Sequence, residues 1–215
     1  MRDIKKWIWD FDGTLLDNVE ANFRAVNALI QAAGGRSATR ADLQECTVGP
    51  IMRFYENRGC NLDVVLNQPE IYYDMYECLV GESQLHQHVF EILELLQSRT
   101  LRQVVLSNNR QSVVRRHLDR CRVGHFFADI LASECVREVI TNSLTKRERV
   151  LDILKHYQPT DLVLVGDTVE EVEIANEFGI RSIIIASGYQ TRHRLEAAKP
   201  TMLLNSYLQL LEELL

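Results

Sequence analysis

Short runs of apolar residues, separated by longer helical patterns, constrain the fold more than any other feature of this sequence. The runs lie at residues 5–9, 102–107, 161–166 and 181–186, with weaker ones at 128–132 and 201–204. Their hydrophobicity is continuous rather than alternating, which is typical of strands covered on both faces and so of a parallel sheet. The helical patterns between the runs provide the crossovers. The sequence therefore predicts an α/β fold with a doubly wound, mainly parallel sheet.

The segment between the first two strong runs is too long for a simple crossover. Residues 18–99 contain several amphipathic helical patterns and no convincing strand. We interpret this segment as an inserted α-helical cap, and we assign its last helical pattern, at 88–99, to the core. We therefore expect an α/β core made of residues 1–17 and 86–215, and a helical cap made of residues 18–85.

Composition and charge argue against several classes of function. The formal net charge of -6 argues against a nucleic-acid binder and against a protein that reaches anionic membranes through a basic surface. The charged stretch after Met1 is unlike a secretory signal, and no apolar run approaches the roughly 18 residues of a membrane span. The five cysteines are scattered and never spaced as CxxC, which supports neither disulfides nor a zinc site. We expect a cytoplasmic monomer or homodimer.

Acidic and hydroxyl side chains stand where the predicted strands end. Asp10 and Asp12 follow the first run, Ser107 ends the second, and Asp167 follows the run at 161–166. Ligands of open α/β sheets bind beyond the carboxyl ends of the strands, so we expect these side chains to share one site. Carboxylates this close raise one another's pKa unless a cation is present, and Mg²⁺ prefers oxygen ligands. One carboxylate can attack phosphorus while its neighbour moves the proton.

These residues and their spacing resemble the motifs of the haloacid dehalogenase (HAD) superfamily. Within it, the chain is similar to phosphoglycolate-phosphatase-like phosphohydrolases with a helical (C1) cap after the first motif. The matching segments are DFDGTLLD (10–17), LSNN (106–109), a lysine before a helix (Lys146) and VGDTVEEVEIA (165–175). The resemblance implies a Rossmann-like core and a Mg²⁺-dependent phosphatase that hydrolyses a small phosphorylated metabolite through an aspartyl-phosphate intermediate.

The resemblance also implies a role for each matching residue. Asp10 resembles the nucleophile, Asp12 the general acid/base, and Lys146 the cation that neutralises the charge of the nucleophile and the phosphate. The residues that resemble phosphate-binding groups are Thr14, Ser107, Asn108 and Lys146. The residues that resemble metal ligands are Asp10, Asp12, Asp167 and Glu171. Such an arrangement orients the phosphoryl group and stabilises its transition state.

Two positions depart from the family pattern. Lys146 lacks the proline-containing context often seen around the lysine of the third motif, and Arg147 and Arg149 are close rivals for its role. Glu171 stands where the family often has Asp. Either this longer acid binds the metal through water, or Glu170 takes the role.

The cap contains one candidate for substrate specificity. Arg53 lies in VGPIMRFYENRG (48–59), which resembles the loop and helix by which relatives contact the leaving group of the substrate. Arg53 is therefore a candidate for binding a second anionic group, and the alternative is a surface arginine on an amphipathic helix. We expect Tyr72, Tyr73 and Tyr76 to pack within the cap rather than to line a pocket.

Two other functions stay open at this point. A phosphomutase of the β-phosphoglucomutase type would reuse the aspartyl-phosphate to rephosphorylate its product. A catalytically weak binding or regulatory member of the same fold would keep the residues without turnover. The sequence does not name the phosphomonoester.

Overall fold

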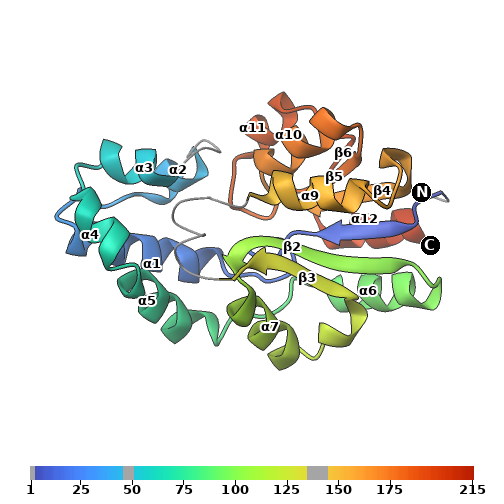
Figure 1. Cartoon of the computed structure of the whole chain (residues 1–215), viewed down its shortest axis with the longest axis horizontal. Coiled ribbons are helices and arrows are strands. Elements are labelled where there is room, and N and C mark those ends of the chain that lie inside the picture. The colour runs from blue at the N-terminus through green and yellow to red at the C-terminus, as the bar shows by residue number, and fades with distance from the viewer. Residues whose placement is uncertain (1–2, 46–50, 135–144) are drawn as a thin grey trace.

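A parallel sheet forms the centre of the molecule. The computed structural model describes residues 3–45, 51–134 and 145–215. The strands of this part of the chain are β1 (Lys6–Trp9), β2 (Arg102–Arg110), β3 (Asp129–Ser133), β4 (Leu162–Gly166), β5 (Arg181–Ile185) and β6 (Met202–Leu204). They pair in parallel in the order β3-β2-β1-β4-β5-β6 (Figure 1). All six predicted runs are strands, and the predicted doubly wound sheet is confirmed.

Helices cover both faces of the sheet, which explains why the strands are apolar throughout. Trp7 and Trp9 pack into one hydrophobic cluster, whereas Ile8, between them in the strand, packs into another. The helices of the first cluster include α6 (Val89–Ser98), α7 (Gln111–Arg120) and α12 (Tyr207–Leu214). Those of the second are α9 (Lys146–Leu154) and α10 (Val169–Phe178). Helix α11 (Arg192–Ala197) lies between β5 and β6. Two short 3-10 helices precede strands: η1 (Gly124–Phe126) precedes β3, and η2 (Pro159–Asp161) precedes β4.

In the described residues between β1 and α6, five helices extend to one side of the sheet (Figure 1). They are α1 (Val19–Ala32), α2 (Arg40–Gln44), α3 (Ile51–Asn57), α4 (Leu62–Asn67) and α5 (Glu70–Val80). Their outer residues, such as Ile30 and Phe54, form a hydrophobic cluster of their own. In contrast, Ala25 on α1 and Tyr76 on α5 join the cluster that packs against the sheet. This packing supports the division into a core and a cap of residues 18–85, which stays a proposal.

Strand β2 is longer than the sequence predicted. Its pairing with β3 shifts register between Leu106 and Arg110, and the strand then continues to Arg110. A shift of this kind re-aims the side chains that follow it, and here those side chains are Ser107, Asn108 and Asn109. The short helices α4, α11 and α12 were not anticipated either.

None of the helices in the described part of the chain is long and apolar enough to cross a membrane. Cys60, Cys78 and Cys121 carry free thiols. Cys46 and Cys135 lie outside the described residues.

Candidate active site

Asp10 lies directly after β1, where the chain enters a tight turn. Its backbone N–H donates a 2.9 Å hydrogen bond to the carbonyl of Val165 in β4. Gly13 follows with a φ of 82°, a left-handed conformation that residues with a side chain rarely adopt. A Cβ at Gly13 would lie 2.6 Å from Oδ2 of Asp167. Gly13 therefore lets the turn after β1 approach the end of β4 closely, which brings Asp10 near Asp167.

The carboxylate of Asp10 is buried and contacts a lysine and a hydroxyl. Lys146 Nζ donates to Oδ1 at 2.6 Å, and Thr14 Oγ1 donates to Oδ2 at 3.0 Å. Burial raises the pKa of Asp10 to about 7, against the opposing effect of the Lys146 ammonium. The structure thus brings together three predicted site residues, of which Asp10 and Lys146 are 136 positions apart in the sequence.

Asp167 adds a second buried carboxylate to this cluster. Its Oδ1 accepts a 3.0 Å hydrogen bond from the hydroxyl of Thr14, which also contacts Asp10. A hydroxyl has one proton and can donate to only one of these carboxylates at a time. Oδ2 of Asp167 is buried without a hydrogen-bond partner. Burial, together with Asp10 and Glu171, raises the pKa of Asp167 well above its usual value, so the pair of carboxylates fits a bound cation.

Lys146 opens helix α9, and several carboxylates share its ammonium group. Nζ lies 2.6 Å from Asp10 Oδ1, 2.5 Å from Glu171 Oε1 and 3.5 Å from Glu170 Oε2. Burial opposes the positive charge, but Asp10 and Glu171 outweigh it and raise the pKa of Lys146 well above its usual value. Lys146 is therefore held as a cation at the edge of the site.

The two sequence rivals of Lys146 have other partners. Arg147 lies on the surface of α9 and donates to Glu177 of α10 at 2.9 Å. Arg149 is buried, and its Nη2 donates to Oγ of Ser133 at 3.0 Å. Of the three basic residues, Lys146 is the one that forms an ion pair with Asp10.

Glu171 uses its two carboxylate oxygens for different purposes. Oε2 accepts from Thr168 Oγ1 at 2.5 Å and from the Thr168 N–H at 3.2 Å, which caps α10, while Oε1 pairs with Lys146. A Cβ at Gly166 would lie 2.3 Å from the Glu171 side chain, so this packing depends on a glycine. The described residues contain no group of three or more His, Cys, Asp or Glu side chains placed to hold a metal ion. Of the predicted metal ligands, Asp10 and Asp167 are adjacent, whereas Glu171 faces Lys146.

The side chain of Asp12, another predicted ligand, is held by neutral donors from three segments of the chain. Its Oδ1 accepts from Asn18 Nδ2 at 2.6 Å and from the Tyr76 hydroxyl at 2.7 Å. Asn109 Nδ2 lies 3.3 Å from Oδ1 and 3.2 Å from Oδ2. Asp12 is therefore held where the turn after β1, the end of β2 and helix α5 meet.

The predicted phosphate-binding residues of the second motif lie beside these carboxylates. The buried Ser107 hydroxyl is 3.5 Å from Asp12 Oδ2, and the Asn108 amide donates to Glu170 at 3.0 Å. Arg53, in contrast, has an exposed side chain on α3. It makes no hydrogen bond or ion pair with another described residue, so the structure does not join it to this cluster.

Sequence reasoning overlooked part of the network around Asp12. Asn18 was not singled out, yet its Oδ1 accepts from the Gly13 N–H at 2.9 Å and from the Tyr189 hydroxyl at 3.3 Å. The ring of Tyr76 stacks on Tyr72 of the same helix, with centroids 5.7 Å apart, and its hydroxyl reaches the site. The chemistry of tyrosine could have indicated this contact, because a buried tyrosine hydroxyl needs a polar partner.

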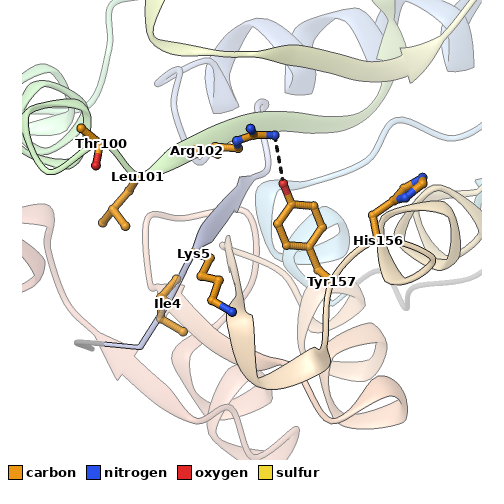
Figure 2. Close-up of a pocket in the computed structure, with 7 residues that line it drawn as sticks. All are labelled: Ile4, Lys5, Thr100, Leu101, Arg102, His156 and Tyr157. Carbon is orange, nitrogen blue, oxygen red and sulfur yellow. Dashed lines mark hydrogen bonds between the residues drawn. The ribbon is translucent and has the colours of Figure 1, made fainter.

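A separate pocket of about 480 Å³ lies at the amino ends of β1 and β2, opposite the strand ends that carry the cluster around Asp10 (Figure 2). It is lined by Ile4, Lys5, Thr100, Leu101, Arg102, His156 and Tyr157. Arg102 donates to the Tyr157 hydroxyl at 3.3 Å, and Lys5 pairs with Asp161 at 3.0 Å. This pocket shares no residue with the cluster around Asp10.

The arrangement of these residues on a parallel sheet has counterparts among known proteins. The profile of the haloacid dehalogenase-like hydrolases matches residues 7–185, which includes every motif described above. The chain belongs to the haloacid dehalogenase-like hydrolase family. The resemblance seen in the sequence is confirmed.

Relatives of this HAD-like hydrolase match it over nearly its whole length. The phosphoglycolate phosphatase of Synechococcus elongatus is 26% identical over 209 residues, covering 95% of this chain and 94% of the relative. The phosphoglycolate phosphatase of Vibrio vulnificus is 24% identical and covers 100% of this chain and 97% of its own length. Among solved structures, a haloacid dehalogenase-like hydrolase of Streptococcus pneumoniae superposes with a TM-score of 0.83 at 21% identity, over 100% of both chains. A predicted phosphatase of Clostridium acetobutylicum has a TM-score of 0.82 at 19% identity, over 98% of this chain and 97% of its own.

Proposed function

We propose that this HAD-like hydrolase is a Mg²⁺-dependent phosphatase that hydrolyses a small phosphorylated metabolite, with 2-phosphoglycolate as the first candidate. The observation that carries the proposal is the buried Asp10 carboxylate held between Lys146 Nζ and Thr14 Oγ1, at 2.6 and 3.0 Å. The names of the curated relatives support the choice of substrate.

Asp10 is the proposed nucleophile. One of its carboxylate oxygens forms a bond to phosphorus, and the bond between phosphorus and the leaving oxygen of the substrate breaks. This step needs an ionised Asp10, although burial raises the pKa of the side chain to about 7. The Lys146 ammonium opposes that rise, so its contact with Asp10 favours the reactive form and offsets charge on the phosphoryl group.

Asp12 is the proposed general acid and base. In the first step it donates its proton to the leaving oxygen. In the second step it takes a proton from water, the water oxygen bonds to phosphorus, and the bond to Asp10 breaks to release phosphate and restore the carboxylate. The hydrogen bonds from Asn18, Tyr76 and Asn109 would orient this carboxyl group for both steps.

The phosphate would be bound by Ser107 and Asn108 at the end of β2 and by Lys146 at the start of α9. The hydroxyl of Thr14 is used by Asp10 and Asp167. We therefore assign Thr14 to orienting these carboxylates next to the phosphate.

The donor set at Asp10 and Asp167 fits Mg²⁺. It offers two buried carboxylates, one of which has an oxygen without a partner, and Mg²⁺ takes one or two carboxylates together with waters and phosphate oxygens. We propose Asp10, Asp167 and the main-chain carbonyl of Asp12 as ligands, with Glu171 supporting the site through Lys146. When bound, the ion would neutralise charge on the transferring phosphoryl group.

Phosphate release from a panel of phosphomonoesters, with and without Mg²⁺, tests the proposal. We expect Mg²⁺-dependent turnover by the wild type and a loss of about 10³-fold or more in Asp10→Asn, because the nucleophile is removed. Asp17→Asn is a matched control, since Asp17 is an exposed acid in the same motif. Turnover that required a sugar bisphosphate would instead indicate a mutase, and no turnover of any panel member would reject the proposal.

A further inference from the structure

Arg110 is the last residue of β2 and stands at the start of α7. It follows Ser107, Asn108 and Asn109, and it lies beyond the register shift that ends the regular part of the strand. Its backbone N–H donates to the side chain of Asn109 at 2.8 Å. The position of the Arg110 backbone is therefore tied to the same segment that contacts Asp12.

Among the described residues, the guanidinium group of Arg110 has a stacking partner but no anionic one. It lies over the ring of Tyr73 on α5, 3.9 Å from the centroid. Its Nε is buried without a hydrogen-bond acceptor, and no carboxylate among the described residues forms an ion pair with it. The side chain of Arg110 is half-buried, and cations removed from water are normally paired, because an unpaired charge there is costly. Lys146 follows this rule with partners at 2.6 and 2.5 Å.

Two neighbours place Arg110 beside the proposed general acid. Asn109, the preceding residue, donates to Asp12, and so does Tyr76, which lies one helical turn after Tyr73. Burial raises the pKa of Tyr73, while Arg110 and Asp12 shift it in opposite directions, which agrees with both charges lying near this ring. A group that protonates the leaving oxygen must lie next to the leaving group. The organic part of the substrate would therefore be near Arg110.

We propose that Arg110 binds a second anionic group, a carboxylate, on the leaving-group part of the substrate. This inference rests on the proposed phosphatase function and names a specificity residue for it. A guanidinium offers a planar fork of donors that matches a carboxylate, and the face of an aromatic ring can hold that plane in place. Arg110 takes the role that the sequence suggested for Arg53, whose side chain is exposed on α3.

The test compares two substrates that differ in one group. 2-Phosphoglycolate carries a carboxylate, whereas ethyl phosphate has the same two-carbon length without it. We expect wild-type kcat/KM to be at least tenfold higher for 2-phosphoglycolate. Arg110→Gln should lower kcat/KM for 2-phosphoglycolate by about 10- to 100-fold, the effect of losing a charged hydrogen bond, and change that for ethyl phosphate by less than threefold.

Further variants separate specificity from folding. Arg110→Lys keeps the charge but loses the fork, so we expect an intermediate loss with 2-phosphoglycolate alone. Arg147→Gln removes a surface arginine that pairs with Glu177 and should leave both substrates unchanged. Arg53→Gln tests whether Arg53 binds the carboxylate instead. The melting temperature of each variant reports on its folding.

The possible outcomes differ for the two proposals. Equal losses with both substrates in Arg110→Gln and Arg110→Lys would overturn the inference and indicate a structural role. So would unchanged kinetics in both variants, or a preference for the carboxylate that disappears in Arg53→Gln instead. A wild type that hydrolyses both substrates equally well rejects the role of Arg110 alone, whereas one that releases no phosphate from any ester rejects the phosphatase function.

Discussion

The hydroxyl of Tyr76 donates a 2.7 Å hydrogen bond to Oδ1 of Asp12. Tyr76 belongs to α5, in the proposed cap, whereas Asp12 belongs to the turn after β1. The same hydroxyl accepts a 2.7 Å hydrogen bond from Asn18, so three residues form a continuous chain between cap and core. The orientation of the proposed general acid therefore depends on how the cap is packed.

Replacing Tyr76 by Phe should impair proton donation more than phosphate binding. The variant keeps the ring and its stacking but loses one donor to Asp12, an interaction worth about 1 kcal/mol. For an alkyl phosphate, whose leaving oxygen needs a proton, we expect kcat/KM to fall about fivefold. For p-nitrophenyl phosphate, whose leaving group needs little help, the loss should be under threefold.

Tyr72→Phe is the matched control for this prediction. Tyr72 lies one turn earlier on α5, and its hydroxyl donates to Asn22 rather than to Asp12. We expect its kcat/KM for both substrates to equal that of the wild type. If Tyr76→Phe lowered kcat/KM equally for the alkyl and the aryl ester, Tyr76 would have no specific link to proton transfer.

Glu171→Gln distinguishes a residue that positions Lys146 from a metal ligand. Glu171 holds Lys146 Nζ at 2.5 Å, so loss of its charge should loosen the lysine and lower kcat by about tenfold. The Mg²⁺ concentration for half-maximal rate should stay within twofold of the wild-type value. An increase of tenfold or more in that concentration would show instead that Glu171 ligates the metal.

Asp167→Asn should separate the stability of the metal-free protein from its response to Mg²⁺. Asp167 is fully buried, and burial raises its pKa well above normal, so a neutral amide should cost the metal-free fold little or stabilise it. In the wild type, 10 mM Mg²⁺ should raise the melting temperature by about 3 °C if Kd is near 1 mM. Thermal scans with EDTA and with Mg²⁺ measure both, and a full Mg²⁺ shift in Asp167→Asn would remove Asp167 from the ligand set.

The sequence was sufficient for the parts of the site that follow directly from the strands. Asp10 and Asp167 stand next to continuous apolar runs, and parallel strands bring their carboxyl ends to one edge of a sheet. The choice of Lys146 over Arg147 and Arg149 depended on the rotation of α9 about its axis. The pair Thr145 and Glu148, which forms a capping box, marks the start of this helix and could have narrowed the choice.

The sequence was insufficient for contacts that depend on packing between segments. The reach of Tyr76 to Asp12 follows from how α5 packs against the sheet, and periodicity reports only that a tyrosine lies on a buried face. The position of Arg110 depends on the register shift after Leu106, for which the run of Ser, Asn and Asn has no local signature. Both residues lie where the proposed cap meets the core.

His117 gives a pH-dependent prediction that is independent of the active site. It is buried on α7, and its Nε2 has no hydrogen-bond partner, since Glu77 Oε2 is 3.7 Å away. Burial, aided by the charges of Arg120 and Arg116, lowers the pKa of His117 from 6.5 to about 4. The imidazole is therefore neutral in the folded protein at pH 5, whereas in the unfolded chain it is mostly protonated.

The unfolding free energy should therefore fall as the pH decreases from 6.5 toward 4, because the unfolded state binds a proton that the folded state does not. Between pH 7 and pH 5 we expect His117 to contribute a loss of about 1 kcal/mol, discounted for solvent screening near the surface. Urea denaturation at both pH values should show a smaller pH-dependent loss in His117→Gln than in the wild type. His193→Gln, which replaces an exposed histidine, should behave like the wild type, and equal losses in all three proteins would show that His117 titrates normally in the fold.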